Sequence, residues 1–107
     1  MPRQDILDDP GSACPQLRQF LGGYFHEDWV AERQRWEEIV DDFVAESPRT
    51  TVMECTEELG ELVDVDLTDG ELAAVLEGLG CSVDPSAFGM QRNQWLAAVR
   101  RRLAAAL

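Results

Sequence analysis

The fold of this chain depends most on the stretch Phe20-Leu21-Gly22-Gly23-Tyr24-Phe25-His26-Glu27-Asp28-Trp29. The chain has three tryptophans, one tyrosine and four phenylalanines, and this stretch holds four of those eight rings together with the single histidine. Large aromatic side chains are buried in a small domain, and paired glycines permit a sharp turn or a close approach of the backbone. We therefore expect this stretch to form a corner of the hydrophobic core.

Outward from this corner, apolar residues recur at three- and four-residue steps, which is the pattern of amphipathic helices. Pro15 is expected to open a short helix that ends at Gly22-Gly23. Thr68 and Glu71 have the spacing of a capping box. The predicted helices cover about 15–22, 32–46, 48–63, 68–80 and 91–103, with Ser47 as the N-cap of the third. The fold class is therefore all-α, a small single-domain bundle of about five helices.

The 107 residues are enough for one domain with a single core. Residues 1–13 lack periodicity and contain Pro2, Pro10 and Gly11, so they are expected to be a flexible N-terminal tail before a helical domain over 14–107. No apolar run approaches the roughly 20 residues of a transmembrane helix, and the N-terminus lacks the pattern of a secretory signal. These features favour a cytoplasmic protein. Its three cysteines fit buried small hydrophobes better than disulfides or a zinc site.

Charge is the most informative feature of the composition. Twenty-one acidic residues face nine arginines and no lysine, for a net charge of −12. Residues 48–90 hold ten of the acidic residues and one arginine, whereas residues 91–107 hold four arginines and no acidic residue. Such a chain repels nucleic acid and anionic membranes and is attracted to a basic protein.

The densest acidic cluster lies on the predicted helix 48–63 and directly after it. Its glutamates recur at three- and four-residue steps opposite an apolar stripe, so they share one face of the helix. A face that serves solubility alone usually mixes both signs of charge. We expect this cluster to bind a partner and to imitate the phosphates that a nuclease accepts; it comprises Glu54, Glu57, Glu58, Glu61, Asp64, Asp66 and Asp69.

No metal, cofactor or catalytic site is predicted. A calcium loop beginning at Asp64 fails because Asp69 replaces the required glycine and Val75 replaces the bidentate glutamate. Catalysis near neutral pH would depend on His26, and sequence neighbours such as Glu27 and Asp28 do not by themselves orient an imidazole. His26 is expected to hold the tight corner or to contact a partner.

The segment Gly22–Trp29, GGYFHEDW, resembles the GGYFHQDW opening of the CdiI-type immunity proteins of contact-dependent growth inhibition, with Glu27 where glutamine is common. The similar order continues through two acidic helices, Gly80-Cys81-Ser82-Val83-Asp84-Pro85 and Trp95-Leu96, and spans about Gln16 to Leu103. The resemblance implies a protein that binds and silences the toxin of its own cell without chemistry of its own. It also marks a mainly structural motif of Gly22, Gly23, Phe25, Asp28 and Trp29.

The resemblance and the charge together predict a cognate protein toxin as partner, with a nuclease domain whose basic cleft the acidic surface occludes. Tyr24 and His26 join the acidic cluster as candidate toxin contacts if their side chains point outward. The alternative is an acidic nucleic-acid mimic or adaptor without a dedicated toxin. Direct nucleic-acid binding and membrane association are not expected, and no homo-oligomeric state is predicted.

Overall fold

The computed structural model describes residues 3–26 and 35–107. Within these ranges the chain forms helices and no strand, so the all-α class is confirmed. The elements are α1 (Arg3–Asp8), α2 (Pro10–Ala13), α3 (Pro15–Tyr24), α4 (Trp36–Glu46), α5 (Arg49–Asp64), α6 (Asp69–Gly78), the 3-10 helix η2 (Pro85–Phe88) and α7 (Arg92–Ala105). This is more than the predicted five or so, mainly because the N-terminal segment adds α1 and α2.

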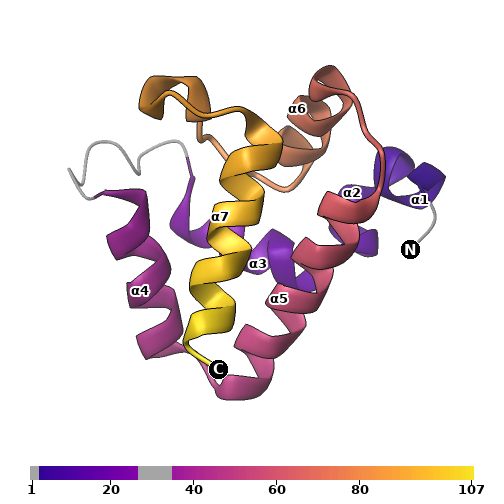
Figure 1. The fold of residues 1–107 in the computed structure, drawn as a ribbon. Helices are drawn as coiled ribbons and strands as arrows, with labels where there is room; N and C mark the ends of the chain where they lie inside the picture. The colour runs from indigo at the N-terminus through magenta and orange to yellow at the C-terminus, as the bar shows by residue number, and fades with distance from the viewer. Residues whose placement is uncertain (1–2, 27–34) are drawn as a thin grey trace.

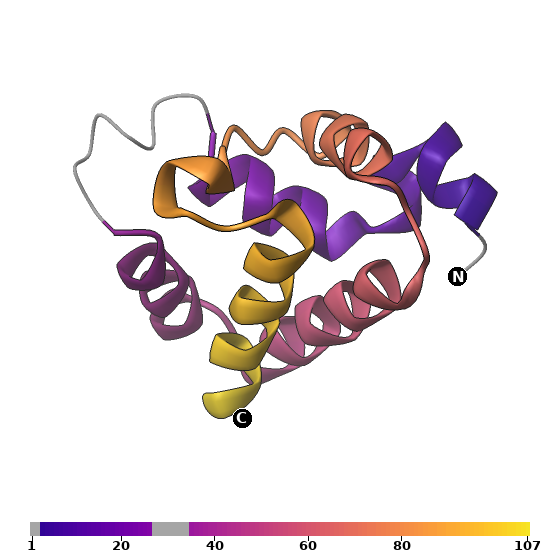
Figure 2. The ribbon, with the colours of Figure 1, turned by 45° about the horizontal axis from the view of Figure 1, so that its top comes forward.

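Helix α7 holds the domain together. It lies between α4 and α5 and contacts both, and its first turns also contact α6 and η2 (Figure 1). Helix α3 runs behind α7, between α6 and α5 (Figure 2). The buried residues of α7 are Trp95, Leu96, Val99 and Leu103, a three-and-four spacing that brings one face of the helix against these neighbours.

The N-terminal segment differs from the expected flexible tail. Residues 3–13 form α1 and α2, which contact α6, and the Ile6 side chain is completely buried. Asp9 caps α2 by accepting hydrogen bonds from the Ser12 backbone N–H and hydroxyl group, and Pro10 occupies the first position of the helix. Helical periodicity cannot be recognised in so short a segment. The segment is anchored to the domain by the buried side chain of Ile6.

Most predicted helix boundaries lie within a few residues of those observed. The capping box of α6 is confirmed, since Thr68 accepts from the Glu71 backbone N–H while Glu71 accepts from that of Thr68. The start of α5 was predicted wrongly. Pro48 is the N-cap residue, the helix begins at Arg49, and Ser47 is instead the C-cap of α4.

The aromatic stretch forms the expected corner of the core. Phe25 is fully buried at the end of α3, and its ring packs edge-on against Trp95 of α7 at a centroid distance of 5.3 Å. Phe20 stacks on Phe43 of α4 at 4.2 Å. The backbone carbonyl of Phe25 also accepts from the Ser82 N–H at 2.7 Å, which ties the corner to the segment after α6. Asp28 and Trp29, predicted to be structural, lie outside the described residues.

The three cysteines are buried, as expected of small hydrophobic residues. Burial raises the pKa of Cys14 and Cys81 to about 11 and that of Cys55 to about 12, so all three remain neutral near physiological pH. Among the described residues, no helix combines the length and the apolar character needed to cross a membrane.

Candidate functional site

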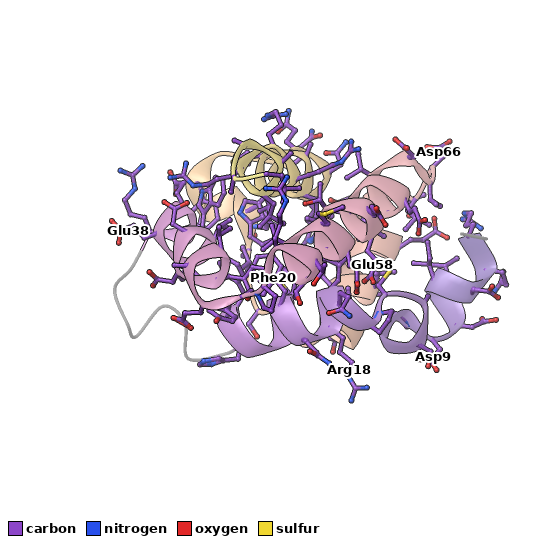
Figure 3. All side chains as sticks on the ribbon, turned by 90° about the horizontal axis from the view of Figure 1, so that it is seen from below. Asp9, Arg18, Phe20, Glu38, Glu58 and Asp66 are labelled. Carbon is purple, nitrogen blue, oxygen red and sulfur yellow. The ribbon has the colours of Figure 1, made fainter. Side chains whose placement is uncertain are left out.

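Glu58 does not lie on the exposed acidic face with which it was grouped. Its half-buried side chain points from α5 to the first turn of α3 and lies between the two helices (Figure 3). The carboxylate accepts from the backbone N–H of Gln16 and of Leu17, each at 3.0 Å. Because the N-cap residue Cys14 makes no side-chain cap, Glu58 satisfies amides that the helix itself leaves unpaired. Its role is to join α3 to α5.

The buried position of Glu58 changes its acidity. Burial raises the pKa of its carboxyl above the ordinary value of 4.5, the two backbone hydrogen bonds oppose this shift, and nearby Glu54 and Glu61 add to it. A raised folded-state pKa means that the folded protein binds this proton more tightly than the unfolded chain does. The stability contributed by protonated Glu58 is therefore fully present below pH 4.5 and is lost as the pH rises through the raised pKa.

We expect the substitution Glu58→Gln to remove this pH dependence while leaving one oxygen to cap α3. The free energy of unfolding of the wild type minus that of the variant should become smaller as the pH rises from about 4 to about 7. Urea unfolding of both proteins across this range measures the difference. Glu57→Gln is the matched control, because it deletes a carboxylate that caps no helix. If the stability of the wild type relative to Glu58→Gln instead increased with pH, the raised pKa of Glu58 would be contradicted.

The remaining carboxylates of α5 form a continuous exposed surface, which we call the α5 acidic face: Glu54, Glu57, Glu61 and Asp64. Three- and four-residue spacing places them on one side of the helix over about 15 Å of its length. None of the four forms an ion pair or a side-chain hydrogen bond with the rest of the described chain. Asp66, in the connection to α6, is also exposed and likewise unpaired within the described ranges (Figure 3).

Arginines neutralise several other carboxylates. Arg102 of α7 donates two hydrogen bonds of 2.8 Å to Asp41 of α4, and this contact lowers the pKa of Asp41. Asp69, which was predicted to belong to the partner surface, pairs with Arg92 at 2.8 Å. Further pairs join Arg3 to Glu71 and Arg35 to Glu37. The α5 acidic face and Asp66 form no such pair with the described residues, although the guanidinium of Arg100 lies against α5 at Gly60.

Tyr24 and His26 are not placed among the α5 carboxylates. The Tyr24 hydroxyl donates to Glu46 at the end of α4, at 2.7 Å, and its ring packs against Phe43. Burial and this contact raise the pKa of Tyr24 to about 12. His26 is half-buried just after α3. The Tyr24 side chain thus belongs to the aromatic corner.

Met53 is a surface residue that sequence patterns did not single out. It precedes Glu54 on α5 and is 41% exposed, which makes it one of the few large apolar side chains at the surface of the described chain. Helical spacing places it one turn from Glu57, at the border of the α5 acidic face. A single exposed methionine has no signature in sequence, because its exposure depends on which helix faces are covered.

The described residues contain no group of three or more histidine, cysteine or carboxylate side chains arranged to hold a metal ion. The candidate surface that remains consists of an acidic helix face, an acidic connection and one exposed methionine. A model of the CdiI immunity protein family matches residues 13–103 of the chain. Neither a curated protein nor a solved structure matches it.

Proposed function

The chain belongs to the CdiI immunity protein family, whose members neutralise toxins and are inhibitors rather than enzymes, and from this premise we propose how it inhibits. It binds a cognate toxin domain, a nuclease, and covers the basic active-site cleft with the α5 acidic face and Asp66. The carboxylates take the place of the phosphates of the toxin's nucleic-acid substrate. Inhibition is stoichiometric and requires no reaction by the inhibitor.

One observation carries this proposal: the carboxylates of the α5 acidic face and Asp66 are exposed, unpaired among the described residues and close together in the chain, whereas Asp41 and Asp69 are each held by an arginine. Uncompensated like charges on one helix face are mildly unfavourable for the isolated protein. They become favourable when a basic surface approaches. Met53, beside this face, offers the apolar contact that acidic side chains lack.

Long-range attraction speeds the encounter of such a surface with a basic cleft, and the aligned carboxylates then restrict the orientation of the two proteins. Most of the affinity comes from a few buried contacts over roughly 800 Å² per partner. The encounter takes place in the cytoplasm, where an incoming nuclease would find its substrate.

Co-expression with the toxin encoded beside this gene tests the proposal. We expect rescue from that toxin alone, co-purification of the two proteins in a fixed ratio, and loss of nuclease activity in the mixture. Rescue from several unrelated basic toxins would support the alternative, a general nucleic-acid mimic. Absence of both rescue and complex formation would rule out the proposed function.

The charge of the α5 acidic face should control the rate of association. The triple variant Glu54→Gln, Glu57→Gln, Glu61→Gln is expected to bind the toxin about tenfold more slowly at low salt. The wild-type association rate should likewise fall when the salt rises from about 50 to about 500 mM. Stopped-flow fluorescence with a catalytically inactive toxin measures both effects.

The matched control changes the same amount of charge elsewhere, at three exposed carboxylates on other helices: Asp5→Asn, Glu38→Gln and Glu77→Gln. If steering depends on local geometry, this control keeps most of the wild-type rate. Equal slowing in both triple variants would show that only net charge matters. Unchanged rates in the α5 variant would place the interface elsewhere.

A further inference from the structure

A surface hollow lies at the end of the α5 acidic face. It is bounded by the α5–α6 connection, the first turns of α6 and α7, and η2, at the end of the molecule remote from the C-terminus (Figure 1). Two adjoining cavities of about 680 and 330 Å³ share Leu67, Leu72 and Asn93 as lining residues. The two cavities therefore lie side by side, and together we call them the α6–α7 hollow.

The lining of the α6–α7 hollow is apolar at its base and acidic at its rim. Leu72 and Pro85 are buried, and Leu67 and Met90 are half-buried beside them. The acidic residues that line it are Asp64, Asp66, Asp69 and Asp84, against the single cation Arg92. Arg92 is already bound to Asp69 at 2.8 Å, and its charge also helps to lower the pKa of Asp84, so the four carboxylates outnumber the one cation.

Two helices begin at this hollow, and side chains already accept from two of the backbone N–H groups at the start of each. At the start of α6, the side chains of Thr68 and Glu71 cap each other's backbone N–H groups. At the start of α7, the Gln94 side chain accepts from the Gln91 backbone N–H, and the Asn93 side chain accepts from the Gln94 backbone N–H, each at 2.9 Å. Asp84 is held by the Ser86 hydroxyl and backbone N–H, which lower its carboxyl pKa and keep it ionised. Local charge thus favours a cation.

We propose that the α6–α7 hollow receives an arginine side chain of the toxin. The aliphatic stem would lie over Leu67, Leu72 and Met90, and the guanidinium would reach the acidic rim, to which Asp66 and Asp84 contribute. Arginine combines an apolar stem with a planar donor group that suits carboxylates, and it is common among residues that dominate interface affinity. The hollow shares Asp64 with the α5 acidic face, so one basic surface can contact both. This inference rests on the proposed function.

The first experiment needs no toxin. Arginine amide is titrated into the protein while methyl signals of Leu67, Leu72 and Met90 are followed by NMR. Norleucine amide, which has the same α-amino group but an uncharged side chain, serves as the comparison probe. We expect saturable shifts with arginine amide at millimolar concentrations and none with norleucine amide. Asp66→Asn combined with Asp84→Asn should abolish them. No shifts with arginine amide, or equal shifts with both probes, would overturn the inference.

The second experiment uses the inactive toxin domain. Asn93→Trp places a large side chain where the two cavities meet, and we expect its dissociation constant to rise at least tenfold. Ala45→Trp is the matched control, because it adds the same side chain at an exposed position on the last turn of α4, near the C-terminus of the protein. The control should bind as the wild type does.

The outcomes separate the two proposals. If the α5 triple variant binds more slowly while Asn93→Trp binds as the wild type does, the arginine site is wrong and the proposed function stands. If the wild type does not bind the toxin at all, the proposed function fails, and the arginine titration alone decides whether the hollow is a cation site. If Asn93→Trp does not fold, that titration again gives the answer.

Discussion

Replacing Trp95 by alanine is expected to lower the free energy of unfolding by about 3–5 kcal/mol, the largest effect of any substitution considered for this protein. The side chain is completely buried in α7, and its ring contacts Phe25 at 5.3 Å and Trp36 at 6.1 Å between centroids. Removing the Trp95 side chain leaves a cavity between α7 and the aromatic corner. Helix α7 contacts most of the other elements, so the loss affects the whole domain. Urea unfolding with an unchanged m-value measures the loss.

Two further substitutions make the Trp95 result specific. Within the described residues the indole Nε1 has no hydrogen-bond partner, so Trp95→Phe removes an unpaired polar atom as well as part of the ring. We expect it to lose less than half as much stability as Trp95→Ala. Met53→Ala, at an exposed position, should change stability by less than about 0.5 kcal/mol. A loss below about 1 kcal/mol for Trp95→Ala would contradict the packing described.

The paired glycines Gly22 and Gly23 are expected to respond oppositely to alanine. A Cβ atom at Gly22 would lie 2.8 Å from the backbone carbonyl oxygen of Leu79, where α3 crosses the end of α6. Relief requires the backbone to move, and we expect Gly22→Ala to destabilise the protein by about 1–3 kcal/mol. A Cβ atom at Gly23 meets nothing within 4 Å. Gly23→Ala should therefore stabilise the helix, by about 0.5–1 kcal/mol.

The two variants are controls for each other, since both exchange the same residues within the last turn of α3. Thermal and urea unfolding of both, measured beside the wild type, test the prediction. The crossing also involves Gly80, which has a φ of +78° and whose Cβ would lie 3.2 Å from the Cα of Gly22. Equal effects at Gly22 and Gly23 would mean that helix propensity, and not the crossing, explains the motif.

Much of the fold follows from local sequence. The three-and-four spacing of apolar residues predicts α4, α5 and α7, and the Thr68 and Glu71 spacing predicts the start of α6. These signals are reliable because each depends on residues within one or two helical turns of each other. The segment 3–13 escaped prediction because its order depends on contacts of α1 and α2 with α6, which lies far along the chain.

The candidate surface could be predicted only in part. Spacing correctly groups Glu54, Glu57 and Glu61 on one side of α5, because a helix fixes which residues share a face. The same spacing also puts Glu58 in this group, although Glu58 lies at the edge of that side of α5. Spacing cannot show that α3 begins against this edge. The pairing of Asp69 with Arg92 connects residues 23 positions apart and has no local signature.

The sequence by itself determined the all-α class, the family motif and the concentration of acidic charge on and after α5, since composition and helical period are properties of the chain alone. Tertiary structure decided which of those charges remain free. It assigns Glu58 to the start of α3 and Asp69 to Arg92, and it forms the α6–α7 hollow from segments separated in sequence. The physical reason is that the availability of a charged group depends on its neighbours in space, and these are set only when the helices pack.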